Sequence, residues 1–156
     1  IQMQRRTFMK GTLAGSTIAV AISAGLLSPR TVLAAWPKSA FGAKTVQDAL
    51  SGLFGSADNT PSGDIQIKAP DIAENGAVVP VSVTTSIAGI SSIAILAEKN
   101  ASPLTANFEL ASNAKGYVST RIKMGKTSDV IAVVKAGGKA YSARKNVKVT
   151  IGGCGG

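Results

Sequence analysis

The chain has 156 residues, with 17 Lys and Arg, 8 Asp and Glu, one Cys and no His. Without His it lacks the commonest metal ligand and the usual general base at neutral pH. A single Cys excludes an internal disulfide and any CxxC zinc or redox motif. Aromatic residues make up 4%, which argues against a stacking surface for nucleic-acid bases, while 45% hydrophobic residues argue against intrinsic disorder. The length fits one domain with a short appendage.

The N-terminal segment carries a twin-arginine export signature. Its residues are Arg5, Arg6, Phe8 and Lys10, and an uncharged stretch from residue 11 to 27 follows them. That stretch lies at the short end of what a membrane span needs, so a retained membrane anchor is the weaker alternative. The signature is an address for export rather than an anchor.

We expect residues 1–34 to be a signal peptide that is cut after Ala34, with Ala35 as the alternative. The remainder then holds 13 Lys and Arg against 8 Asp and Glu, a net charge of +5 rather than +9. The predicted location is the periplasm, with no membrane segment left after cleavage. The twin-arginine route carries folded proteins. Because no cofactor ligand set is visible, we expect a partner assembled in the cytoplasm to explain the choice of route.

Basic residues gather in the last third of the chain. From Lys115 onward there are nine Lys and Arg and one acid, Asp129. Such a surface attracts anions of any kind, and no nucleic-acid motif accompanies it. The run from Gly125 to Thr127 resembles the end of a phosphate-binding loop, but the Gly required five residues before it is Thr120. We therefore predict a basic surface without a nucleotide site.

A short helix is predicted at about residues 45–54. Its apolar residues fall at the i, i+3, i+4, i+7 and i+8 positions of one helix face. Thr45 and Asp48 resemble a capping box, and Gly55 is a suitable stop.

Beyond the helix the apolar residues alternate with polar ones, as in strands. The alternating segments are 65–68, 79–84, 118–123 and 147–151, and the denser apolar runs 93–96 and 130–134 suit central strands. Gly137-Gly138 predicts a hairpin turn. Pro80 predicts that its strand is an edge or bulged strand. The fold class is therefore mainly β, a sandwich with a short N-terminal helix, and residues 35–151 form the domain.

The chain ends in Gly152-Gly153-Cys154-Gly155-Gly156, directly after the last strand pattern. Nothing local can bury this thiol, and glycine allows more backbone conformations than any other residue. We call residues 152–156 the C-terminal arm and expect it to be flexible and thin. The thiol lacks a His, a metal or a helix N-terminus to lower its pKa. It is therefore better suited to carrying a covalent group than to catalysis, and no catalytic or metal site is predicted.

These features resemble one known family. The GGCGG terminus, the twin-arginine signal and the segment 72–83 (IAENGAVVPVSV) are similar to SoxY, the sulfur-carrier subunit of the periplasmic Sox thiosulfate-oxidising system. The resemblance covers nearly the whole chain. It implies an immunoglobulin-like β-sandwich that carries sulfur intermediates as adducts of Cys154.

The resemblance also implies a set of partners. A SoxZ-type subunit would complete a heterodimer, and the carrier would hold no cofactor of its own. The haem enzyme SoxXA attaches thiosulfate oxidatively, the dimanganese hydrolase SoxB releases sulfate, and a molybdenum–haem enzyme, where present, oxidises the remaining sulfane sulfur.

Two other interpretations stay open. One is a structural adaptor whose Cys154 forms an intermolecular disulfide. The other is a carrier activated at the carboxylate of Gly156, as ubiquitin-like proteins are. That activation needs ATP, which an exported protein lacks, and leaves Cys154 without a role.

Overall fold

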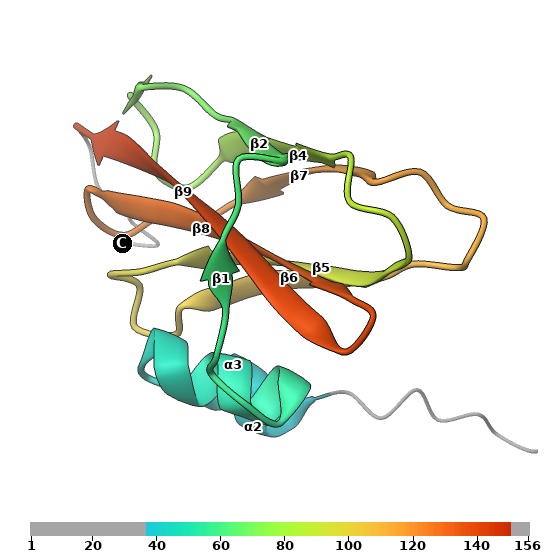
Figure 1. Cartoon of the computed structure of the whole chain (residues 1–156). Coiled ribbons are helices and arrows are strands. Elements are labelled where there is room, and N and C mark those ends of the chain that lie inside the picture. The colour runs from blue at the N-terminus through green and yellow to red at the C-terminus, as the bar shows by residue number, and fades with distance from the viewer. Residues whose placement is uncertain (1–36, 151–156) are drawn as a thin grey trace, which may run out of the picture. The chain divides into compact units, whose positions relative to one another are not determined.

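The computed structural model describes residues 37–150. The elements in chain order are α2 (Lys38–Gly42), α3 (Val46–Phe54), β1 (Thr60–Pro61), β2 (Ile65–Lys68), β3 (Ile72–Ala73), β4 (Val79–Thr85), β5 (Ile90–Ala97), β6 (Leu104–Glu109), β7 (Tyr117–Ile122), β8 (Ser128–Ala136) and β9 (Lys139–Val149). They form a mainly β domain with two short helices at its start (Figure 1). The predicted fold class is confirmed.

Two sheets face each other across the main core. The larger sheet has the order β1-β9-β8-β5-β6, with β3 also paired to β9, and the smaller one has the order β2-β4-β7. In β4 the residues alternate, and Val79, Val81 and Val83 are buried. They pack in one cluster with Ile93 and Ile95 of β5. Alternation at a period of two therefore buries one side of β4 against the larger sheet.

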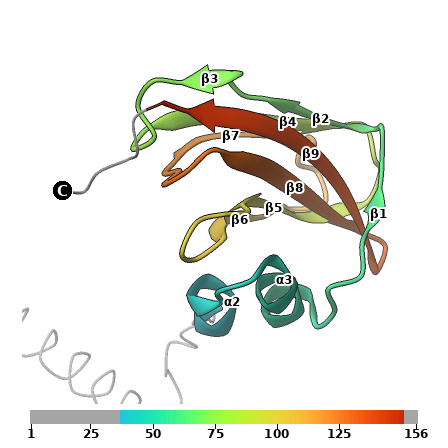
Figure 2. The same ribbon diagram turned by 90° about the vertical axis from the view of Figure 1, so that its left-hand side faces the viewer.

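The helices cover the outer face of the larger sheet (Figure 2). Ala49 and Leu50 of α3 belong to a second buried cluster with Leu96 of β5 and Ile131 and Val133 of β8. Strands β5 and β8 are thus buried on both faces, which explains why their sequences are continuous apolar runs rather than alternating ones.

Helix α3 confirms the predicted helix. The hydroxyl of Thr45 accepts a hydrogen bond from the Asp48 amide at 3.1 Å, and Gly55 ends the helix with φ 78°. Gly137 and Gly138 both have positive φ, 57° and 78°, so they form the predicted hairpin turn between β8 and β9.

The prediction for Pro80 was wrong. Its strand, β4, is the central strand of the smaller sheet rather than an edge. Proline is tolerated there because β2 ends at Lys68, which pairs with Ser82. Pro80 is paired only with Arg121 of β7. The backbone N–H that proline lacks is therefore at a position beyond the last pair between β2 and β4.

Candidate functional site

The predicted site residues fall at the two ends of the chain. The arm residues Gly152, Gly153, Cys154, Gly155 and Gly156, and the signal residues Arg5, Arg6, Phe8 and Lys10, lie outside the described residues. The structure does show the end of β9, after which the arm begins.

The last residues before the arm are held on both sides. On one side β3 runs parallel to β9, where the Lys148 amide donates to the Asp71 carbonyl at 2.9 Å and the Thr150 amide donates to the Ala73 carbonyl at 3.1 Å. On the other side the intervening amide, that of Val149, donates to the hydroxyl of Thr127 at 2.8 Å. Pairing of β9 with β8 ends at Val147, and the Thr127 hydroxyl, which also donates to the Val149 carbonyl at 3.3 Å, extends the contact between the two segments beyond it.

Two loops lie at this same end of the sandwich. They are the β5–β6 loop (98–103) and the β7–β8 loop (123–127), and Figures 1 and 2 show both on the side of the domain where β9 ends, the β7–β8 loop being the nearer to that end. Asn100 joins the loops, because its side-chain amide donates to the Lys123 carbonyl at 2.6 Å and its carbonyl accepts from the Gly125 amide at 2.9 Å. The fully buried Met124 anchors the second loop in the core. This end is therefore fixed by hydrogen bonds and packing.

Some of the nearby cations are already paired. Arg144 donates to Glu98 at 3.1 Å and to Asp129 at 3.4 Å, and Lys145 lies 3.0 Å from Asp71. The hydrogen bond to Glu98 raises the pKa of Arg144 above its ordinary value. The charge of these two basic residues is therefore partly neutralised by their partners.

Two hollows border this end. One, of about 550 Å³, is lined by three lysines of the two loops, Lys99, Lys123 and Lys126. The other, of about 390 Å³, lies along β3 and is lined by the exposed Ile72 and Val78, among others, with the Glu74 side chain. The two hollows differ in charge, and the first of them favours anions.

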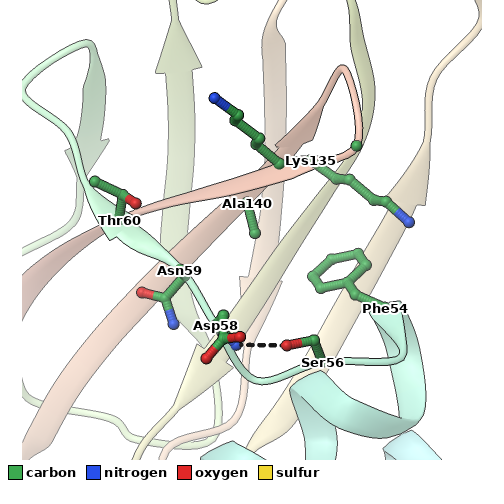
Figure 3. A pocket seen from close by; sticks show the side chains of 9 residues that line it. Phe54, Ser56, Asp58, Asn59, Thr60, Lys135 and Ala140 are labelled. Atoms are coloured by element: carbon green, nitrogen blue, oxygen red, sulfur yellow. Dashed lines mark hydrogen bonds between the residues drawn. The ribbon is translucent and has the colours of Figure 1, made fainter.

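A third hollow, of about 410 Å³, lies where α3, β1 and the β8–β9 hairpin meet (Figure 3). The ammonium of Lys135 stands 5.5 Å from the ring centre of Phe54, and the Asp58 amide donates to Ser56. Lys139 lines this hollow and begins β9, whose eleven residues end near the arm. At about 3.3 Å per residue the hollow lies roughly 33 Å from the arm's attachment point.

The described residues hold no evident metal site or membrane span. Within residues 37–150 no group of three or more His, Cys, Asp or Glu side chains is placed to bind a metal ion. None of the helices in that range is long and apolar enough to cross a membrane.

Comparison with known proteins places the chain in a family. The profile of the family described as "Sulfur oxidation protein SoxY" matches residues 50–154. The chain belongs to the SoxY family. A solved structure of the sulfur carrier protein SoxY from Chlorobium limicola f thiosulfatophilum is 48% identical, with a TM-score of 0.63. The match covers 74% of this chain and 100% of that one.

The other comparisons add less. A superoxide reductase (neelaredoxin) from Ignicoccus hospitalis is 18% identical over 55% of this chain and 79% of its own, with a TM-score of 0.49. A search of curated proteins found no significant match. The SoxY match runs through residue 154. Sequence reasoning missed the three lysines that line one hollow between two loops.

Proposed function

We propose that this protein carries sulfur intermediates of thiosulfate oxidation as covalent adducts of Cys154 and presents them to partner enzymes. The observation that carries the proposal is the SoxY family match through residue 154, together with a 48% identical sulfur carrier protein. Both support a sulfur-carrier role. The attachment at Cys154 is our inference from the single Cys in the GGCGG terminus.

The chemistry suits a carrier better than an enzyme. Attaching thiosulfate joins the cysteine sulfur to the outer sulfur of thiosulfate and releases the thiol proton and two electrons. A partner must accept those electrons, because a chain without His and with one Cys offers no electron acceptor. We assign that step to a SoxXA-type haem enzyme. Hydrolysis by a SoxB-type enzyme and oxidation by a molybdenum–haem enzyme, where present, would follow on the same sulfur.

We further propose that residues 1–34 direct export by the twin-arginine route and that residues 35–151 form the domain that bears the arm. The mature protein would then act in the periplasm as a heterodimer with a SoxZ-type subunit. The twin-arginine signature and the lack of an evident cofactor ligand set support this, since a cytoplasmically assembled partner gives a reason to export a folded protein.

The experiment is an intact-mass measurement of the exported protein, in complex with its SoxZ-type subunit, after incubation with thiosulfate and the cognate haem enzyme. We expect the mass to rise by one thiosulfate group less one hydrogen. Cys154→Ser should abolish the gain and thiosulfate-dependent oxygen uptake while leaving the thermal unfolding temperature unchanged. The matched control is Ser112→Cys in the Cys154→Ser background, which restores an exposed thiol without the arm.

The results separate the alternatives. A mass gain in the wild type alone supports the carrier. Unchanged oxygen uptake by Cys154→Ser would rule out the carrier role. A doubled mass that reductant reverses, without thiosulfate attachment, would instead favour the adaptor with an intermolecular disulfide.

A further inference from the structure

The hollow between the β5–β6 and β7–β8 loops has the composition of an anion site. Lys99 comes from the first loop, Lys123 and Lys126 come from the second, and Ser102 adds a hydroxyl to the lining. Lys123 and Lys126 lie 24 and 27 residues after Lys99 in the sequence, so only the fold brings the three lysines to one hollow. Several cations around one concavity raise the local concentration of anions.

None of these three lysines forms an ion pair with a carboxylate within residues 37–150, in contrast to Arg144 and Lys145 on β9. Within residues 37–150 the ion pairs involve only Arg144 and Lys145, which bind Glu98, Asp129 and Asp71. The hollow therefore keeps its positive charge available for a ligand.

The backbone beneath the lysines is held in place. The Asn100 side chain spans the two loops with hydrogen bonds of 2.6 and 2.9 Å, and buried Met124 fixes the second loop, with its amide donating to the Gly76 carbonyl at 2.7 Å. A fixed backbone lowers the ordering cost of binding, since only the lysine side chains need to settle.

The hollow also lies close to the end of β9, from which the arm continues. Thr127, the residue after Lys126, bonds the backbone of Val149 through its hydroxyl. Cys154 lies four positions after Thr150 in the sequence, which allows a reach of up to about 14 Å. The hollow at the other end of β9 is roughly 33 Å away and out of range. The hollow along β3 is also close, but its Glu74 carboxylate would repel an anion.

From these observations we propose that the pocket of Lys99, Lys123 and Lys126 binds the anionic sulfonate end of the group carried on Cys154. The inference rests on the proposed function, because it takes the carried group to be an adduct of thiosulfate. A sulfonate is a compact tetrahedral anion, and lysine ammoniums bind such groups as point charges from several directions. Held in this way, the loaded arm would lie against the protein between visits to partner enzymes.

The test attaches two labels to Cys154 of the ¹⁵N-labelled protein in complex with its SoxZ-type subunit. One methanethiosulfonate reagent leaves an ethylsulfonate and the other leaves an ethyltrimethylammonium, and both attach by the same disulfide without any enzyme. We expect the sulfonate label to shift the amide resonances of Asn100 and of residues 123–126, and the ammonium label to leave them in place. A parallel titration with sodium thiosulfate at constant ionic strength measures binding of the free anion.

The variant Lys99→Gln/Lys123→Gln/Lys126→Gln should lose the label-dependent shifts and bind free thiosulfate at least fivefold more weakly. The control Lys38→Gln/Lys115→Gln/Lys139→Gln removes the same charge elsewhere and should behave as the wild type. Equal effects of the two triple variants would overturn the proposal, because net charge alone would then explain the binding. Binding of free thiosulfate without a response to the tethered sulfonate would overturn it too.

This outcome is independent of the carrier test. The labels react chemically, so the pocket can be confirmed or refuted even if no enzyme loads Cys154. Conversely, enzymatic loading with no shift in the pocket would refute only the pocket.

Discussion

The bond between Thr127 and Val149 makes a measurable prediction about where the arm begins. Thr127→Val keeps the size of the side chain but removes the hydroxyl that accepts from the Val149 amide at 2.8 Å. The Thr127 side chain is exposed, so the net value of the bond should be near the middle of the usual range, about 1 kcal/mol. That amount corresponds to roughly a fivefold change in the local opening equilibrium.

The assay is amide hydrogen exchange followed by NMR. We expect the Val149 amide to exchange about fivefold faster in Thr127→Val, with a smaller change at Lys148 and Thr150, whose amides donate to β3 instead. Ala132, in the buried middle of β8, should be unaffected. Thr127→Ser keeps the hydroxyl and serves as the control. If Val149 exchanges at the wild-type rate in Thr127→Val, the hydroxyl does not hold the end of β9 and the argument fails.

Three further predictions concern a tight contact, a titrating side chain and the arm. A Cβ on Gly116 would lie 2.5 Å from the Thr85 carbonyl oxygen, so Gly116→Ala should lower the free energy of unfolding in urea by about 2 kcal/mol. A Cβ on Gly125 would have its nearest neighbouring atom 3.9 Å away, so Gly125→Ala should lower the free energy of unfolding much less. Equal losses of stability in the two variants would contradict the steric explanation. Hydrogen bonds from Ser82 and then Ser119 hold the pKa of Tyr117 below its ordinary value, so Ser82→Ala should raise that pKa in a spectrophotometric titration referenced to Tyr117→Phe. An unchanged titration would remove Ser82 as the cause. Finally, Gly152→Val/Gly153→Val should slow enzymatic thiosulfate attachment by about tenfold, near 1.4 kcal/mol, while alkylation of Cys154 by iodoacetamide stays the same. Loss of both rates together would show that the thiol's own surroundings had changed.

The parts of the fold that sequence predicted are those with a strong local pattern. The runs 93–96 and 130–134 lie in β5 and β8, whose two buried faces require apolar residues at every position. Gly137-Gly138 was predictable because few residue pairs supply two positive φ angles.

The missed elements lack such a pattern. β6 has the sequence LTANFE, in which polar Thr105 and Asn107 interrupt the apolar residues. β1 and β3 are two residues long and exist only through parallel pairing with β9, far away in sequence. α2 is five residues long, too short for a helical period to appear.

The same limit applies to the candidate site. The GGCGG terminus is a local signal and pointed to Cys154 directly. The sequence shows the excess of basic residues after Lys115, but it does not show which of these residues are paired with acids. The ion pairs of Arg144 and Lys145 depend on contacts between segments that are distant in the sequence. The same is true of the hollow that Lys99 and Lys126 both line, between two loops joined by Asn100.

The two-sided anchorage of β9 has a consequence for how partner enzymes would share the carrier. With Thr150 bonded to β3 and the preceding Val149 bonded to the β7–β8 loop, the sulfur of Cys154 would stay within about 14 Å of one fixed point. Any enzyme that acts on it must then bring its active site to this single end of the sandwich. Two globular enzymes cannot occupy so small a region together. Successive steps would therefore exclude one another in time, and the order of reactions would be set by which enzyme recognises the group then on the sulfur.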